Sequence, residues 1–447
     1  MKIQIEQLDL LAPWPAITMR EGYYAVRVIV RAGTVSIGDV FCRPVRGRLV
    51  TPRRLQRRIA RKYGQRIVEM LGTPGTSEID DILDPTGSPQ AVREAFVEKH
   101  GPRSWPTPGV TVAVVTHGDE ALLAACLCNL KQLDYPDFGI LVVDNGNDPV
   151  PTRDLAEALG VSYLRCLTGK PGRARNAAIE HARTEWVAFI DDDCRPERDW
   201  LRQLVRPAAE HPGCRCVCGM VQPARLESAA DVAFEIHRGL AQRFDEIVLR
   251  RDVISASTRP APLWRLGSTA NLLVHRQFVQ LIGGFDANLP CKEAADLLYR
   301  ALLDDYSVHY APSALVHHHR TWTRKSLRKY IQRCAAAVAA YHVQRMVRYG
   351  DVRSLLELVW HRPKALTCDL VRALRGKSKY PWPLVLVELR ATIAGPWRYV
   401  IETIRRKWKS RTVRLSKAPR APRRYTPDSA SSSSYATPPP NPTHHPA

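Results

Sequence analysis

The hydrophobic pattern changes character at Val110. From there, short apolar runs typical of buried strands alternate with segments of helical periodicity, as in an open sheet wound mostly in parallel. Because a parallel sheet is covered on both faces, helices are expected on either side of it. The expected strands are 110–115, 140–143, 161–164 and 186–190, and the expected helices are 120–133, 172–182 and 197–210.

The segment before this region predicts a small, separate α+β unit over residues 1–105. Residues 24–30 and 37–41 have the β-branched and aromatic composition of a hairpin, and a basic helix is expected from Pro52 to about Met70. Several prolines then indicate a linker to the larger unit, which is expected to cover residues 110–345.

The segment after the larger unit is expected to be helical and basic over residues 346–415. Residues 416–447 are rich in serine and proline and cannot bury a core, so disorder is expected there. Within the helical part, residues 383–389 and 394–399 mix apolar side chains with tryptophan and arginine. That composition suits a membrane interface, and core packing explains it equally well.

Charge restricts the class of partner. The chain has 66 Lys and Arg against 44 Asp and Glu, a net charge of +22, which favours nucleic acid, phosphorylated ligands or an anionic membrane surface. No apolar run is long enough to span a bilayer, and the eleven scattered cysteines indicate reduced thiols. We therefore expect a cytoplasmic protein, which could also bind peripherally at the cytoplasmic face of the membrane.

Three consecutive carboxylates, Asp191, Asp192 and Asp193, follow the apolar run 186–190. Neighbouring carboxylates resist joint ionisation unless a cation neutralises them, so a divalent ion is expected, Mg²⁺ or Mn²⁺. Such ions also take phosphate oxygens, which indicates a phosphorylated substrate. Because parallel strands end at one edge of their sheet, Thr116, Asp144 and the triplet should converge on one crevice. A solvated acidic loop is the alternative.

A glycine- and arginine-containing loop precedes the strand that ends in this triplet. Glycines ahead of a helix let backbone amides approach an anion, and Arg173, Arg175 and Asn176 lie where a diphosphate could reach them. A surface turn with solvated arginines has the same composition.

Two further groups could take part in chemistry. Glu293 and Asp296 are three residues apart and share a helix face, so either could act as a general base, although acids also favour helix N-termini for purely structural reasons. The run 317–319 is three histidines, which could supply a nitrogen ligand to the metal or lie at the surface.

Taken in order, these motifs resemble a known family. Val114-Val115-Thr116, Val142-Val143-Asp144-Asn145, Gly172-Arg173-Ala174-Arg175-Asn176, Phe189-Ile190-Asp191-Asp192-Asp193, Gly283-Gly284-Phe285-Asp286 and the histidines are similar to a family 2 glycosyltransferase of GT-A fold. The resemblance covers about residues 110–345. It implies a Rossmann-like open sheet and transfer of a sugar from a nucleotide diphosphate donor, with inversion at the anomeric carbon.

The resemblance also implies roles for individual residues. Thr116 and Asp144 would hold the nucleoside, Asp191 the ribose side and Asp193 the metal, with His318 as the best match to the metal-side histidine. Asp191 and Asp192 would contact the donor, and Asp191 would also face the metal. A place in cell-envelope or polysaccharide biosynthesis is implied, with a glycan, a lipid-linked or a small-molecule acceptor.

One departure from the family pattern concerns the base. The family shows Gly-Glu-Asp before the acceptor helix, whereas this chain has Lys292-Glu293-Ala294. Either Glu293 or Asp296 takes over, with Glu293 favoured because its longer side chain can reach over Ala294, or the chain is a catalytically impaired nucleotide-sugar-binding protein.

The basic run between Arg405 and Arg424 predicts recruitment to anionic membranes, where lipid-linked acceptors would be found. Nucleic acid is an unlikely partner, because it would leave the carboxylate-lined crevice without a purpose.

Overall fold

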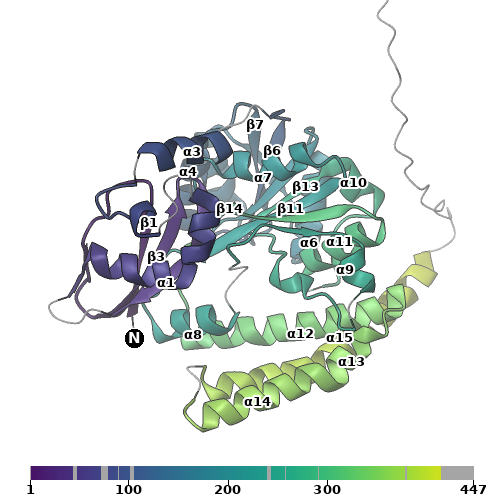
Figure 1. Cartoon of the computed structure of the whole chain (residues 1–447). Helices are drawn as coiled ribbons and strands as arrows, with labels where there is room; N and C mark the ends of the chain where they lie inside the picture. Colours follow the sequence, from purple (N-terminus) through teal and green to yellow (C-terminus); the bar gives the residue numbers. More distant parts are fainter. Residues whose placement is uncertain are drawn as a thin grey trace, which may run out of the picture.

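The computed structural model has three parts (Figure 1), a small unit near the N-terminus, a large twisted sheet covered by helices, and a layer of long helices below it. The structure describes residues 2–43, 48–71, 79–88, 90–100, 105–238, 243–256, 258–289, 291–377 and 380–413. The expected disorder over 416–447 falls outside these residues.

The N-terminal part is an α+β unit, as predicted. Its elements are β1 (Lys2–Asp9), β2 (Ile17–Thr18), β3 (Tyr23–Ala32), β4 (Val35–Cys42), β5 (Leu49–Val50), α1 (Pro52–Leu71), α2 (Ile79–Ile82) and α3 (Gln90–His100). The hairpin β3–β4 and the basic helix α1 confirm the sequence-based expectations, whereas β1, which pairs with β3 in parallel, was not predicted. Helix α1 places Leu55, Ile59 and Ile67 in a core that belongs to this unit.

The central part contains most of the regular structure. Its elements are β6 (Val110–Thr116), α4 (Glu120–Leu130), β7 (Phe138–Asp144), α5 (Val150–Ala158), β8 (Ser162–Arg165), α6 (Pro171–His181), β9 (Trp186–Asp191), β10 (Cys194–Pro196), α7 (Trp200–Glu210), β11 (Cys214–Pro223), α8 (Ala229–Arg238), β12 (Ile247–Leu249), α9 (Asp252–Ser255), η1 (Leu263–Arg265), β13 (Leu272–His275), α10 (Arg276–Leu281), α11 (Glu293–Leu303) and β14 (Ser307–His318).

These strands form a 9-stranded mixed sheet in the order β10-β14-β11-β13-β9-β6-β7-β8, with β12 beside β14. Strands β6 to β9 pair in parallel and β11 pairs with β14 in parallel, while β13 runs antiparallel between β9 and β11. Helices α6, α10 and α11 pack on one face, and α4, α5 and α7 pack on the other. The predicted open, mostly parallel sheet with helices on both faces is therefore confirmed.

A buried asparagine connects the antiparallel strand to its neighbours. The Asn271 side chain donates to the carbonyl oxygens of Met220 (2.9 Å) and Ala314 (2.8 Å) and accepts from the Trp200 indole (2.8 Å). Gly219 leaves room for this network, because a Cβ there would lie 2.3 Å from the Asn271 amide. Asn271 thus joins β11, β13 and β14 to α7, next to the ends of the strands that carry the acids.

The C-terminal part is helical, as predicted. Its elements are α12 (Arg324–Tyr349), α13 (Arg353–Leu356), the π-helical turn η2 (Glu357–His361), α14 (Arg362–Leu374) and α15 (Trp382–Val413). Helix α12 packs closely on α15, where a Cβ at Gly395 would lie 2.5 Å from the Ala336 carbonyl oxygen. Among the described helices, none combines the length and the apolarity that crossing a membrane requires.

Arg27 joins the N-terminal unit to the central part. Its side chain, only 2% exposed, contacts Asp39 on β4 at 2.8 Å and Glu235 on α8 at 3.0 Å. Asp39 also pairs with Lys62 at 3.1 Å, so removal of the Arg27 guanidinium would leave Glu235 as the uncompensated acid.

We predict that Arg27→Met lowers the free energy of unfolding by about 3–5 kcal/mol, because it leaves Glu235 buried without its cation, while Asp39 keeps its ion pair with Lys62. Urea denaturation at pH 7 measures the effect. The matched control is Arg48→Met, whose partner Glu21 is exposed and whose loss should cost less than about 1 kcal/mol. Equal losses in the two variants would contradict the structural role of Arg27.

Candidate active site

A cavity of about 230 Å³ opens at the carboxyl ends of β6 and β9, between the start of α11 and one side of α12. The side chains that line it include both signs of charge and several aromatic rings. The charged members and the histidines are His117, Arg175, Asp191, Asp192, Lys292, Glu293, His318, Arg320 and Arg333, and the aromatic members are Phe234, Trp322 and Tyr330.

Strand β9 delivers the acidic triplet to this cavity. The Thr116 hydroxyl, at the end of the neighbouring strand β6, donates to Asp192 Oδ2 at 2.7 Å. Burial raises the pKa of Asp192 to about 6, and the hydrogen bond from Thr116 offsets only part of that rise. Asp193 is 2% exposed, so a solvated acidic loop does not describe the triplet.

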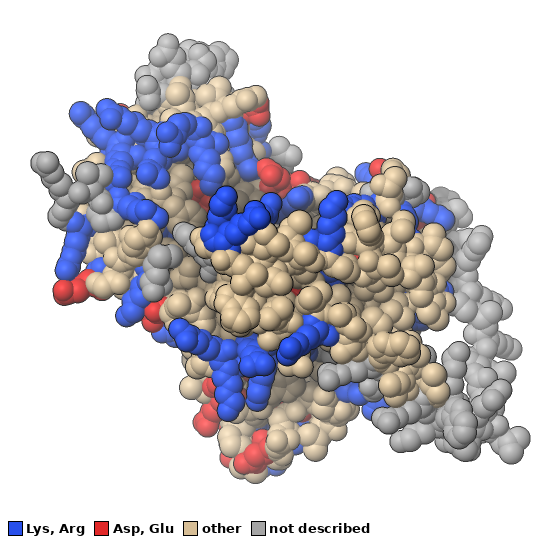
Figure 2. All heavy atoms as spheres, turned by 90° about the horizontal axis from the view of Figure 1, so that it is seen from below, with Lys and Arg blue, Asp and Glu red and all other residues tan. Residues whose placement is uncertain are grey.

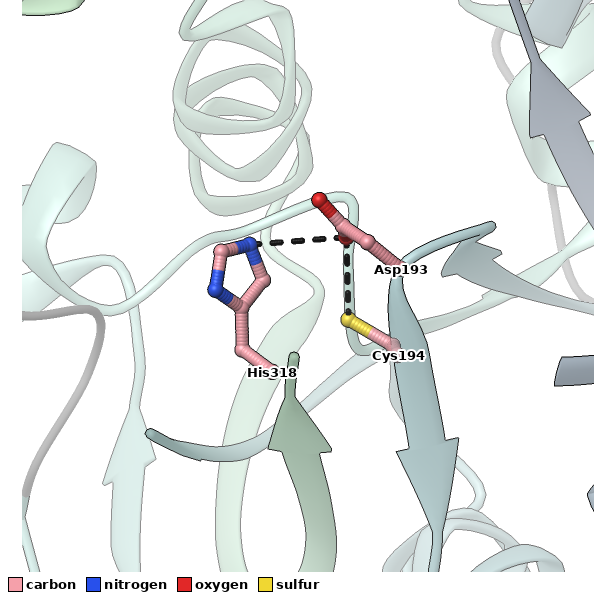
Figure 3. Close-up of side chains that lie close together, drawn as sticks. All are labelled: Asp193, Cys194 and His318. Carbon is pink, nitrogen blue, oxygen red and sulfur yellow. Dashed lines mark hydrogen bonds and ion pairs between the residues drawn. The ribbon is translucent and has the colours of Figure 1, made fainter. Parts of the chain in front are cut away.

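Asp193 lies beside His318 (Figure 3), which comes from the end of β14. His318 Nε2 is 3.4 Å from Asp193 Oδ1, and Arg320 Nε is 2.9 Å from Asp193 Oδ2. Of the three consecutive histidines, His317 pairs instead with Glu197 at 2.8 Å. His318 is therefore the histidine that lies against Asp193, and its role at a metal stays a prediction.

The donor atoms at this point suit a hard divalent cation. Ligand atoms of Asp193, Cys194 and His318 all lie within 4.8 Å of one another. Carboxylate oxygen and imidazole nitrogen are ordinary ligands for Mn²⁺, and Mg²⁺ prefers the oxygens. Burial and the neighbouring carboxylates raise the pKa of the Cys194 thiol. Because Mg²⁺ and Mn²⁺ prefer oxygen to sulfur, Asp193 and His318 are the better ligands of the three. The residues present therefore fit such an ion.

Asp144 is completely buried at the end of β7 and does not line the cavity. Its carboxylate accepts hydrogen bonds from Tyr163 (2.8 Å), Arg165 (2.5 Å) and the Gly146 amide (2.8 Å). The next residue, Asn145, belongs to the same sequence motif, and the sequence alone predicts no role for it.

Asn145 organises the glycine-containing loop. Its Oδ1 accepts from the amides of Thr168 (3.0 Å) and Gly169 (3.1 Å), directly before α6 begins at Pro171. Pro171 and Arg175 on that helix line the cavity, so the start of α6 faces the acidic triplet.

Arg175 connects the triplet to the expected base. It is 6% exposed, forms an ion pair with Glu293 at the first residue of α11, and has its other nitrogen 3.5 Å from Asp191 Oδ1. Glu293 itself is 3% exposed but lines the cavity. Lys292, which precedes it, adopts a left-handed conformation (φ 74°), which turns the chain into the helix.

Three further predicted site residues also lie outside the cavity lining. Arg173 is exposed and outside the cavity lining. Asp296 is fully buried, with its carboxylate paired with Arg300 (2.8 Å) and 3.4 Å from the Tyr349 hydroxyl. Asn176 exchanges two hydrogen bonds with the backbone of Phe285, and the adjacent Gly284 (φ +74°) has no room for a Cβ beside it. Their positions suit structural roles.

Several cavity residues escaped the sequence analysis. Arg320 follows the histidines and could have been found from its position in the chain. Cys291 and Cys334, with sulfur atoms 3.7 Å apart, could not, because one precedes α11 and the other lies in the middle of α12. Their proximity depends on how these two helices pack.

Comparison with known proteins identifies the family of one part of the chain. Residues 111–238 match the family model described as Glycosyl transferase family 2, and this part of the chain is a domain of that family. The chain is 28% identical over 236 residues to a pre-mycofactocin glycosyltransferase of Mycobacterium tuberculosis, covering 52% of this chain and 47% of that protein. It is 34% identical over 163 residues to galactofuranosyltransferase GlfT1 of Mycolicibacterium smegmatis, covering 34% and 51%.

The chain thus spans about half the length of these curated relatives. Among solved structures, it is similar to a mannosyltransferase of Pyrobaculum calidifontis in complex with GDP-Man and Mn²⁺. The identity is 18%, the TM-score is 0.41, and the similarity covers 70% of this chain and 80% of that one.

We predict that Cys334 is alkylated by iodoacetamide at pH 7 faster than the exposed Cys128. The hydrogen bond from Cys291, with Lys292 and Arg333 nearby, lowers the pKa of Cys334, and the thiolate is the reactive form. Peptide mass spectrometry gives both rates. The difference should shrink above about pH 9, where ordinary thiols also ionise, and in Cys291→Ala. Equal rates at pH 7 would contradict the lowered pKa.

Proposed function

We propose that this protein is an inverting glycosyltransferase that moves a sugar from a nucleotide diphosphate donor to an acceptor hydroxyl, with a divalent cation, Mg²⁺ or Mn²⁺. The observation that carries the proposal is the cavity in which Asp191, Asp192, His318 and Glu293 meet, with Asp193 directly behind. The family 2 domain over residues 111–238 supports it, as do the glycosyltransferase names of the relatives.

Within this proposal, Asp191, Asp193 and His318 hold the cation. When bound, the ion supplies positive charge against the departing diphosphate. Thr116 fixes Asp192 by its hydrogen bond. Arg175 would face the phosphates with its guanidinium, and the start of α6 would face them with the positive end of its helix dipole. Asp144 acts from behind, by fixing Arg165 and Tyr163 near the nucleoside side.

Glu293 is the proposed general base, which takes the proton from the attacking acceptor hydroxyl. Arg175 is a positioning residue, because its ion pair holds the Glu293 carboxylate at the cavity wall. Asp296 was the other candidate from sequence. Its carboxylate is committed to Arg300 outside the cavity, which favours Glu293.

The alternative is a nucleotide-sugar-binding protein with impaired catalysis, and Ala294 is the observation that favours it. Ala294 lines the cavity at the position where the family has its usual base. A thermal-shift screen of nucleotide sugars, with and without Mn²⁺, would identify the donor whether the protein is a transferase or only a binding protein. A ligand that binds the native state raises the melting temperature of the protein.

We predict that Asp193→Asn abolishes the Mn²⁺-dependent binding of the donor found in that screen. The change keeps the volume of this buried side chain but removes its charge. Isothermal calorimetry measures the binding, and circular dichroism checks the fold. Asp154→Asn, at an exposed position on α5, is the matched control and should bind normally. Unchanged Mn²⁺ dependence in Asp193→Asn would refute the cation site.

We predict that Glu293→Gln lowers turnover by roughly 100- to 10,000-fold with donor affinity nearly kept, because a positioned base contributes about that much. Release of the nucleoside diphosphate from the identified donor measures turnover. Glu120→Gln, the same change at the exposed start of α4, should be neutral.

Restoring the family residue with Ala294→Asp should raise turnover or leave it unchanged. Full activity in Glu293→Gln would remove Glu293 as the base. A native protein that binds donor but turns over only after Ala294→Asp would favour the binding protein.

A further inference from the structure

The C-terminal helices expose an unusual amount of apolar side chain. Helix α15 carries one stripe of exposed apolar side chains. Its members are three, four or eleven residues apart, so they lie on the same face of the helix. They are Trp382 (47% exposed), Ile393 (63%), Trp397 (69%), Ile401 (47%) and Ile404 (53%). More than half of the exposed large apolar side chains among the described residues belong to this C-terminal part.

A second stripe follows the neighbouring helical segment formed by α13, η2 and α14. Its members are Val352, Leu355, Leu356, Val359, Trp360, Val371 and Leu374. Helix α14 packs against α15 through the buried Arg362, which contacts Glu388 and Thr392. Both stripes therefore lie on the solvent side of helices whose inner sides are already packed.

Basic side chains border these stripes. They are Arg348, Lys364, Arg372, Arg375, Lys377 and Arg390, all exposed. Among the nearby acids, Asp351 and Glu388 are buried in ion pairs with arginines. Asp369 lies 3.9 Å from Arg372, and Glu357 is half-buried. Seen from below (Figure 2), Lys and Arg side chains flank a broad uncharged area, and acidic side chains are few on this face.

We infer that the apolar-basic face of α13, η2, α14 and α15 docks on the surface of a lipid bilayer that contains anionic lipids. Apolar stripes with tryptophan enter the interfacial region, and the surrounding cations meet the anionic headgroups. The inference is independent of the proposed transfer reaction.

Other occupants fit this face less well. Residues 414–447 contain only Leu415, Tyr425 and Tyr435 as large apolar side chains, too few to cover two stripes. A second copy of the chain would bring two basic borders together, which like-charge repulsion opposes. An anionic bilayer matches both the apolar area and the charge.

The inner side of this layer reaches the cavity. Helix α12 packs on α15 and also supplies Tyr330, Arg333 and Cys334 to the cavity wall. Docking would therefore leave α12 and the helices packed on it between the bilayer and the candidate active site.

The test is co-sedimentation of the full chain with vesicles of phosphatidylcholine containing 30% phosphatidylglycerol. The stripe variant Val359→Ser, Trp360→Ser, Ile393→Ser and Trp397→Ser should bind at least 10-fold more weakly. The matched control changes four exposed apolar side chains elsewhere, Val97→Ser, Val150→Ser, Val248→Ser and Leu281→Ser, and should bind like the native chain.

A charge variant, Lys364→Gln, Arg372→Gln, Arg375→Gln and Lys377→Gln, separates the two contributions. Its binding should weaken on anionic vesicles and depend less on salt. All variants should keep their melting temperatures and the donor-induced thermal shift, because these residues lie outside the cavity.

Three results would overturn the inference. In the first, the stripe variant binds vesicles as tightly as the native chain. In the second, truncation after Val413 removes all vesicle binding, which would assign it to the basic tail alone. In the third, the native chain does not bind vesicles and is a dimer, whereas the stripe variant is a monomer, which would make this face a contact between two copies.

Discussion

Concentrated negative charge at the end of β9 is the constraint on which the site depends. Three adjacent carboxylates, partly removed from water, are costly unless cations surround them. The fold supplies these cations from separate elements, with Arg175 from α6 and Arg320 from the turn after β14, and it places the His318 imidazole beside Asp193. The position of each element is therefore linked electrostatically to the triplet.

The same arrangement sets where chemistry can occur. Arg175 contacts both Asp191 and Glu293, so the cation that balances the triplet also holds the proposed base at the start of α11. Asn176, one residue further along α6, holds the loop around Phe285 that leads to α11. Helix α6 thus aligns the acidic edge of the sheet with the base, and Asn271 secures the antiparallel strand β13 beside β9.

The C-terminal helices extend this organisation outward. Their inner sides pack onto α12, and α12 forms part of the cavity wall. Their outer sides expose apolar stripes with basic borders instead of the charged surface that a solvent-facing helix usually has. Helix α12 and the helices packed on it thus separate a surface suited to anionic lipid from a cavity suited to a nucleotide sugar.

The sequence alone was enough for the features that depend on local patterns. Alternating strands and helices predicted the sheet, and the ordered motifs from Thr116 to His318 predicted the family, because strand ends and parallel pairing bring such residues to one edge. Interactions between distant segments were beyond it. The role of Asn145, the ion pair of Asp296 with Arg300 and the proximity of Cys291 to Cys334 depend on helix packing and side-chain pairing. Only the tertiary structure decides those, since periodicity determines which face of an element is buried but not which partner lies against it.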